Sequence, residues 1–257
     1  MQRMKFLAAA LLLLSAGAAS GEILESFNLD DCAWRAENIV VVSGDKVLFL
    51  PLEPKWVSTV WIESHRAFVY QQLWNPGPLE LVPLEMSERE VLQRVDEVRA
   101  LKKKFEEALQ SPDAARTVLP LMRFNSAPVR LLMIGAMQEA GPNGVAALQA
   151  ILGDASLLDL HDDAILALAK AGAIEAGPQL TELLKQALEY WKTIPDAEFF
   201  DHQIYARTYA TLWALRTLRY AEAYDTVLAL RELWQSVPQL RSLDQIAQEC
   251  DGFLKGR

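Results

Sequence analysis

From about Ser87 to the end of the chain, hydrophobic residues recur every three or four positions, the spacing that gathers them on one face of an α-helix. Ser87 and Glu90 form a capping box, which predicts a helix that extends to about Gln110. Ser111-Pro112 predicts the start of another helix, which ends near Arg123. Further helices are predicted over residues 127–139, 144–152, 161–174, 178–191, 201–219, 221–236 and 241–254. The pattern therefore predicts a mainly α-helical region over residues 86–257.

Residues 21–84 have a different pattern, with short runs of β-branched and aromatic residues separated by Gly, Pro, Ser and Asp. The segments Ile39–Val42 and Lys46–Leu50 flank Ser43-Gly44-Asp45, which predicts a β-hairpin. Two more strands are predicted over residues 56–62 and 67–70, and residues 79–82 are predicted to form an edge strand or an extended linker. This segment is expected to form a small β module that precedes the helices.

The helical region contains a repeat. Glu139-Ala140-Gly141-Pro142 recurs as Glu175-Ala176-Gly177-Pro178, at a spacing of about 36 residues that is typical of helical-hairpin repeats. In each copy the motif lies between two runs rich in Ala, Leu and Ile. A third, looser pair has Tyr220-Ala221-Glu222-Ala223 at the corresponding break, and residues 241–254 are expected to cap the last pair.

These features resemble HEAT-type repeats, particularly short bacterial ones, over about residues 111–236. The resemblance is carried by Pro128-Val129-Arg130, by Ala140-Gly141 at the break and by the spacing of Val145, Leu148 and Leu152. It implies a short α-solenoid of antiparallel helical hairpins whose concave face binds other proteins, and it implies no catalytic residues. Asp31-Cys32-Ala33 before Ile39-Val40-Val41 is similar to the leading segment of some exported bacterial repeat proteins.

The first twenty residues have the pattern of a secretory signal peptide. Arg3 and Lys5 precede the apolar run Phe6–Leu14, and the small residues Ser15–Ser20 follow it. The apolar run is too short to span a bilayer. The pattern predicts that residues 1–20 are removed and that the protein is exported, to the periplasm or the cell exterior.

Charge and cysteine content narrow the choice of partners and covalent links. The chain carries a net charge of −9, and removal of Arg3 and Lys5 would make it more acidic, which disfavours nucleic acid and anionic lipid as partners. Two cysteines, Cys32 and Cys250, lie far apart in the sequence. An oxidising compartment permits a disulfide between them, and the alternative is two separate thiols, one or both of them buried.

A search for catalytic motifs finds none. The three histidines, His65, His161 and His202, have no HExxH spacing, and phosphate-binding loops and nucleophile-elbow motifs are absent from the sequence. His161-Asp162-Asp163 superficially resembles part of a metal-dependent phosphohydrolase signature, but the further histidines of that signature are missing. We interpret the triplet as a helix start, where acidic side chains are favoured. No cofactor or metal is expected.

Two groups of aromatic residues are candidates for binding. Trp34, Trp56, Trp61 and Trp74 fall in the N-terminal segment, where they could stack on sugar or peptide, although core packing of a small module is the favoured interpretation. Of these, Trp74 in a Pro-Gly loop is the best candidate for exposure. Tyr205, Tyr209 and Trp213 form a stripe at helical spacing, which could bind a protein but is more typical of a core.

The sequence predicts a non-catalytic protein-binding or scaffold protein of the cell envelope or exterior, which binds an unidentified protein through its repeats. One alternative is a carbohydrate- or cell-wall-binding β module with the repeats as a spacer. A second is a secreted hydrolase without a recognisable motif. Each of these functions rests largely on fold analogy.

Overall fold

A computed structural model describes residues 29–35, 38–43, 46–51, 59–62, 67–70, 80–83, 88–193, 201–237, 240 and 244–256. The predicted signal peptide, Trp56 and Trp74 lie outside these residues. The chain divides into two compact units, Met1–Lys103 and Lys104–Arg257, and the boundary falls within one long helix, α3 (Glu88–Gln110).

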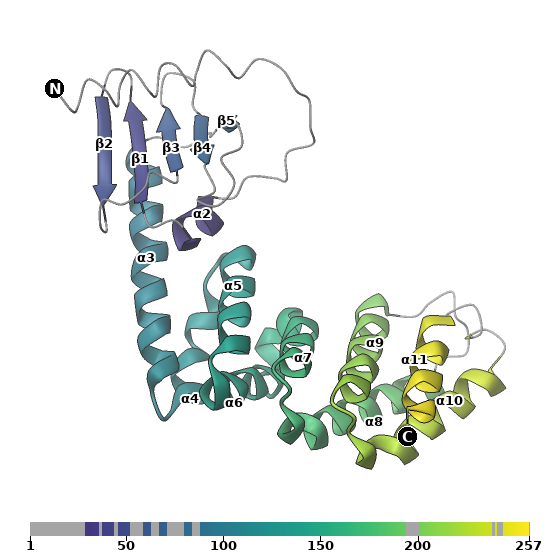
Figure 1. Cartoon of the computed structure of the whole chain (residues 1–257). Helices are drawn as coiled ribbons and strands as arrows, with labels where there is room; N and C mark the ends of the chain where they lie inside the picture. The colour runs from purple at the N-terminus through teal and green to yellow at the C-terminus, as the bar shows by residue number, and fades with distance from the viewer. Residues whose placement is uncertain are drawn as a thin grey trace. The chain divides into compact units, whose positions relative to one another are not determined.

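The strands of the first unit form one five-stranded sheet in the order β2-β1-β3-β4-β5 (Figure 1). The strands β1 and β2 pair antiparallel as the predicted hairpin, β1 and β3 pair parallel, and the remaining pairs are antiparallel. Their bounds are β1 Asn38–Ser43, β2 Lys46–Pro51, β3 Thr59–Ile62, β4 Ala67–Tyr70 and β5 Glu80–Pro83. The backbone alone is described for these strands, so a β module with its own core stays a prediction.

A short helix, α2 (Leu29–Arg35), is attached to α3 within the first unit by polar contacts. The Arg94 guanidinium donates two hydrogen bonds to the Asp30 carboxylate, at 2.6 and 2.7 Å. Lys102 donates to the Trp34 carbonyl at 2.9 Å. Ala33 and Trp34 are buried, as are Val95 and Val98 on α3. Charge-assisted hydrogen bonds thus link α2 to α3.

The second unit is built from helices, which confirms the mainly α-helical class. After α3 come α4 (Ala114–Val118) and the 3₁₀ turn η2 (Leu121–Arg123). The remaining elements are α5 Ala127–Glu139, α6 Gly141–Leu152, η3 Ala155–Leu160, α7 His161–Lys170, η4 Ile174–Ala176, α8 Gly177–Thr193, α9 His202–Thr217, η6 Ala221–Ala223, α10 Tyr224–Ser236 and α11 Asp244–Lys255.

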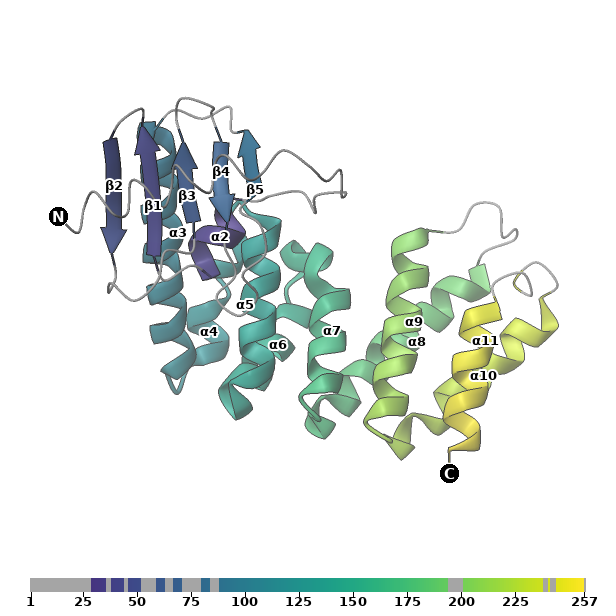
Figure 2. The same cartoon turned by 45° about the horizontal axis from the view of Figure 1, so that its top comes forward.

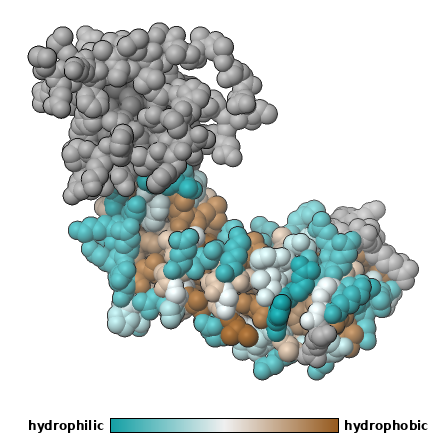
Figure 3. Space-filling view, viewed as in Figure 1, coloured by the Kyte–Doolittle hydropathy of each residue, from teal (hydrophilic) through white to brown (hydrophobic). Residues whose placement is uncertain are grey.

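The strongest contacts among the described helices of this unit join near neighbours in the sequence. Figures 1 and 2 show α5, α7, α9 and α11 side by side in one row, and each contacts the next. The pairs α4–α6 and α8–α10 also pack together, and α8 packs on α9. The core between them is apolar and includes the fully buried Met133, Leu148, Leu168, Trp191 and Trp234. The visible surface is mostly hydrophilic, with hydrophobic patches between the polar side chains (Figure 3).

Several predicted helix bounds are wrong. The helix predicted from Ser111 to Arg123 begins only at Ala114, because the Ser111 hydroxyl accepts the Asp113 N–H at 3.1 Å and forms a turn, and it gives way to η2 after Pro120. The helix predicted to reach Ile174 ends at Lys170, since Gly172 adopts a left-handed φ of 70°. The predicted pairs 127–139/144–152 and 201–219/221–236 correspond to α5/α6 and α9/α10.

Candidate functional site

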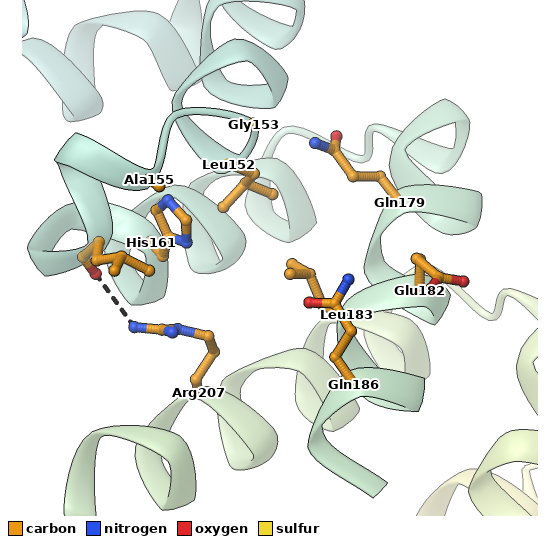
Figure 4. A pocket seen from close by; sticks show the side chains of 10 residues that line it. Leu152, Gly153, Ala155, His161, Gln179, Glu182, Leu183, Gln186 and Arg207 are labelled. Carbon is orange, nitrogen blue, oxygen red and sulfur yellow. Dashed lines mark hydrogen bonds between the residues drawn. The ribbon is translucent and has the colours of Figure 1, made fainter. Parts of the chain in front are cut away.

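A groove in the helical unit is the candidate site (Figure 4). It has a volume of about 330 Å³ and lies where the end of α6, η3, α7, α8 and α9 meet. The residues that line it are Leu152, Gly153, Ala155, Leu158, His161, Gln179, Glu182, Leu183, Gln186 and Arg207. Leucines form its apolar part, and polar side chains stand on both sides.

The irregular segment η3 supplies one edge of the groove. Asp154 caps it by accepting hydrogen bonds from the backbone N–H and the hydroxyl of Ser156, at 2.9 and 2.7 Å. These bonds, with a further one to Arg123, hold the pKa of Asp154 below its ordinary value. Leu157 is buried beneath the segment, whereas Leu158 is 47% exposed and lines the groove. The cap therefore fixes a segment that presents a leucine to solvent.

His161 is the first residue of α7 and is only 4% exposed. Its Nε2 atom lies 3.3 Å from the carbonyl oxygen of Asp154, the residue that caps the start of η3. Burial lowers the pKa of His161, and the positive charge of Arg207 acts in the same direction, while the carbonyls of Asp154 and Ile151 oppose the shift. The imidazole is therefore neutral at pH 7 and closes the groove next to Leu152 (Figure 4).

Arg207 of α9 forms the same side of the groove and is held from two directions. Its Nε atom lies 3.3 Å from an oxygen of the Asp162 carboxylate. Its guanidinium also donates to the Leu158 carbonyl at 3.2 Å, the bond that the dashed line marks in Figure 4. Burial raises the pKa of Asp162 and of Asp163, and Arg207 and Lys170 respectively oppose these shifts. Arg207 thus links α9 to α7 and η3 and has its charge compensated within the fold.

The other side of the groove is one face of α8. Gln179, Glu182, Leu183 and Gln186 follow each other at helical spacing along this face (Figure 4). Gln179 donates its amide N–H to the Gln149 carbonyl at 3.0 Å. Glu182 forms an ion pair of 3.5 Å with Lys185, and both side chains are more than half exposed. This side therefore offers amide groups and a loosely paired carboxylate.

The lining consists of apolar side chains, two amides, an imidazole and two charged side chains. It includes no hydroxyl, thiol or amine that could act as a nucleophile. Within the described ranges, no cluster of three or more His, Cys, Asp or Glu side chains could hold a metal ion. His161-Asp162-Asp163 begins α7, as the sequence predicted, with both aspartates in the first turn.

The predicted aromatic stripe lies elsewhere on α9. Tyr205, Tyr209 and Trp213 are half-buried, and none of them lines the groove. The Tyr205 hydroxyl donates to Gln245 of α11 at 3.4 Å, and Tyr205 also makes an edge contact with Trp191. Arg216 continues the stripe and pairs with Glu249 of α11 at 3.2 Å. The two ends of the stripe therefore contact α11, and a binding role for its aromatic rings stays a prediction.

Cys250 is buried in α11, and burial raises the pKa of its thiol to about 12. The backbone of Cys32 lies in α2, but its side chain is outside the described residues, so the disulfide between them stays a prediction. Trp74, the fourth residue of the predicted binding surface, also lies outside them.

Sequence reasoning missed Leu158, Glu182 and Arg207 as groove residues. The pair Leu157-Leu158 followed by Asp159 offered the one usable signal, because only one of two adjacent leucines in such a short segment can face the core. No local sequence signal indicated Arg207, because its partner Asp162 lies 45 residues away in the sequence.

Comparisons of the chain with models of protein families, with curated proteins and with solved structures found no match. None of the described helices has the length and apolar character needed to cross a membrane.

Proposed function

We propose that the helical region is a HEAT-like α-solenoid and that the protein is a non-catalytic, exported binding protein whose partner is another protein. The row of helices α5, α7, α9 and α11 supports the solenoid, because each helix of the row packs on the next. The leader pattern of residues 1–20 supports export.

The observation that carries the binding function is the groove between consecutive hairpins. Its leucines, one of them about half exposed, lie between polar walls that have hydrogen-bonding capacity. Concave sites with an apolar floor and a few polar groups at the rim are typical of ligand recognition. The lining holds no hydroxyl, thiol or amine nucleophile, which supports binding without catalysis.

The test is affinity capture with the tagged full-length chain from envelope extract of the cells that produce it. Leu158→Glu places a charge in the groove and is expected to abolish capture of the specific partner. Ile174→Glu is the matched control, because Ile174 is also exposed, at 56%, and lies outside the groove lining. Equal capture by both variants would move the binding site elsewhere. Retention only on cell-wall polysaccharide would instead favour the N-terminal segment as the functional part.

A further inference from the structure

The groove also carries information about the chemistry of its partner. We infer that it binds an extended peptide segment in which a medium-sized apolar side chain is close to a Lys or Arg. This inference rests on the proposed function and deepens it.

The apolar side chain of the bound peptide is inferred from the leucines that line the groove and from the volume of the groove. Leu152, Leu158 and Leu183 line a space of about 330 Å³, enough for one or two side chains but too small for a helix, whose diameter is about 10 Å. Leu158 is 47% exposed, so a ligand that covers it removes apolar surface from water. The occupant is therefore a side chain presented by a thin segment of backbone.

The extended backbone of the bound peptide is inferred from the spacing of two side-chain amides on α8. Gln179 and Gln186 are two helical turns apart, which separates them by about 10 Å along the helix, and three residues of extended chain span about the same length. Gln179 uses its N–H on Gln149, which leaves its carbonyl oxygen to accept a hydrogen bond. Gln186 is exposed, and its amide can both donate and accept. The two amides match the donors and acceptors of a peptide main chain.

The basic residue follows from charge complementarity. Two charged side chains line the groove, and Arg207 is already compensated by Asp162 and the Leu158 carbonyl. Among the described residues, Glu182 pairs only with Lys185, and such an exposed ion pair contributes little to stability. The chain as a whole carries −9, so a cationic segment is attracted and an anionic one is repelled. A Lys or Arg next to the apolar anchor can reach the Glu182 carboxylate.

The chain offers a matched control for this role of Glu182. Glu189 lies two turns further along α8 and pairs with Lys192 at the same sequence separation of three residues, but it does not line the groove. Glu182→Arg and Glu189→Arg therefore make the same change of net charge on the same helix. Only the first alters the groove.

The experiment is selection of phage-displayed random heptapeptides on the immobilised full-length chain and on both variants. The native chain should enrich peptides with Leu, Ile, Val or Met adjacent to Lys or Arg, and Glu189→Arg should enrich the same peptides. Glu182→Arg should replace the basic preference with Asp or Glu. An enriched peptide, labelled and measured by fluorescence anisotropy, should bind Glu182→Arg roughly tenfold more weakly and Glu189→Arg unchanged.

Absence of enrichment over an uncoated surface would overturn the inference, as would an acidic motif on the native chain or identical behaviour of the two variants. These results are distinguishable from failure of the proposed function. A partner captured from extract in a Leu158-dependent manner, together with no peptide motif, would leave a binding protein whose groove recognises a folded surface.

Discussion

The two copies of Glu-Ala-Gly-Pro have the same sequence and different structures. In the first, Ala140 alone separates α5 from α6, and Gly141 makes the turn with a φ of 64°. In the second, residues 171–176 separate α7 from α8, the left-handed residue is Gly172, and Gly177 is already helical with a φ of −50°. A repeated motif can therefore mark equivalent helix starts without fixing the turn that precedes them.

The second turn has its structural counterpart in the third hairpin, where the motif is absent. The Ala173 N–H bonds to the Leu168 carbonyl and the Tyr220 N–H to the Leu215 carbonyl, each at 3.0 Å, which is the hydrogen bond of a Schellman motif. The left-handed position is held by Gly172 in one turn and by Arg219, with a φ of 52°, in the other. Each is followed by a 3₁₀ turn, η4 or η6.

The tight first turn should make Gly144 the most sensitive glycine of the repeats. A Cβ atom at Gly144 would lie 1.9 Å from the Met137 carbonyl oxygen. This oxygen belongs to the backbone, so it can move only if the main chain is displaced. The corresponding position after the longer second turn holds the fully buried Leu180. Gly144→Ala is expected to destabilise the protein by about 3 kcal/mol. Urea unfolding followed by circular dichroism measures this, and a loss below that of Gly177→Ala would contradict the explanation.

The second copy should be sensitive at Gly177 for a different reason. A Cβ atom there would meet the ring of Tyr220 from the third hairpin, within 2.3 Å. Gly177→Ala is expected to cost about 2 kcal/mol by overpacking. In a Tyr220→Ala background the same substitution should cost much less, which a double-mutant cycle of unfolding free energies tests. Gly141→Ala is the control from the first copy, where a Cβ meets open space and only the positive φ opposes it.

Substitution of the left-handed residue should change stability in opposite directions in the second and third turns. Gly172→Ala is expected to destabilise the protein by about 1 kcal/mol, because a side chain at positive φ is strained. Arg219→Gly is expected to stabilise it, by up to about 1 kcal/mol, because it relieves the same strain in an exposed residue. Thermal unfolding measures both. A loss of stability in Arg219→Gly would show that the arginine makes contacts that outweigh its backbone strain.

The smallest expected effect concerns the starts of the first two hairpins. Helix α5 begins with Ala127-Pro128-Val129, whereas α7 begins with the buried His161 and two aspartates. Because burial lowers the pKa of His161, its contribution to stability is complete above its unfolded pKa of about 6.5 and is lost as the pH falls below that value. The raised pKa values of Asp162 and Asp163 act oppositely, since their protonation at lower pH relieves buried charge.

We therefore expect His161→Gln to lose less stability than the native chain between pH 7.5 and pH 5.5. Urea unfolding at a series of pH values compares the two. His202→Gln is the control, because His202 is exposed at the start of α9. Parallel curves for the native chain and His161→Gln would show that His161 protonates without cost in the fold.

The sequence predicted the helices well and the turns poorly, for a physical reason. Helix periodicity and capping residues are local signals, so α5 begins at Ala127 and α9 follows Asp201 as expected. The Asp201 carboxylate caps α9 by accepting the Gln203 N–H at 2.8 Å. Turn geometry also depends on contacts between the turn and residues of neighbouring hairpins. The contact between Gly177 and Tyr220 joins neighbouring hairpins and leaves no trace in either segment alone.

The candidate site was predicted less well than the fold. Aromatic residues drew attention to Tyr205, Tyr209 and Trp213, whereas the groove is lined by leucines, glutamines and the charged Glu182 and Arg207. The sequence placed His161 correctly as a helix start. It could not show that α8 and α9 would lie on opposite sides of the groove. That arrangement depends on how successive hairpins pack, which periodicity does not encode.

The neighbour-to-neighbour packing of the helical unit has a kinetic consequence. The side-chain hydrogen bond from Arg207 to Leu158 joins residues 49 positions apart, and the other described side-chain hydrogen bonds within this unit join residues closer in sequence. Chains whose contacts are local close small loops and fold quickly. They can also open locally where a helix has few packing partners. Helix α11 packs on α9 and α10, whereas α7 packs on α5, α6, α9 and η3. We therefore expect amide hydrogen exchange to be fastest in α11 and slowest near α7.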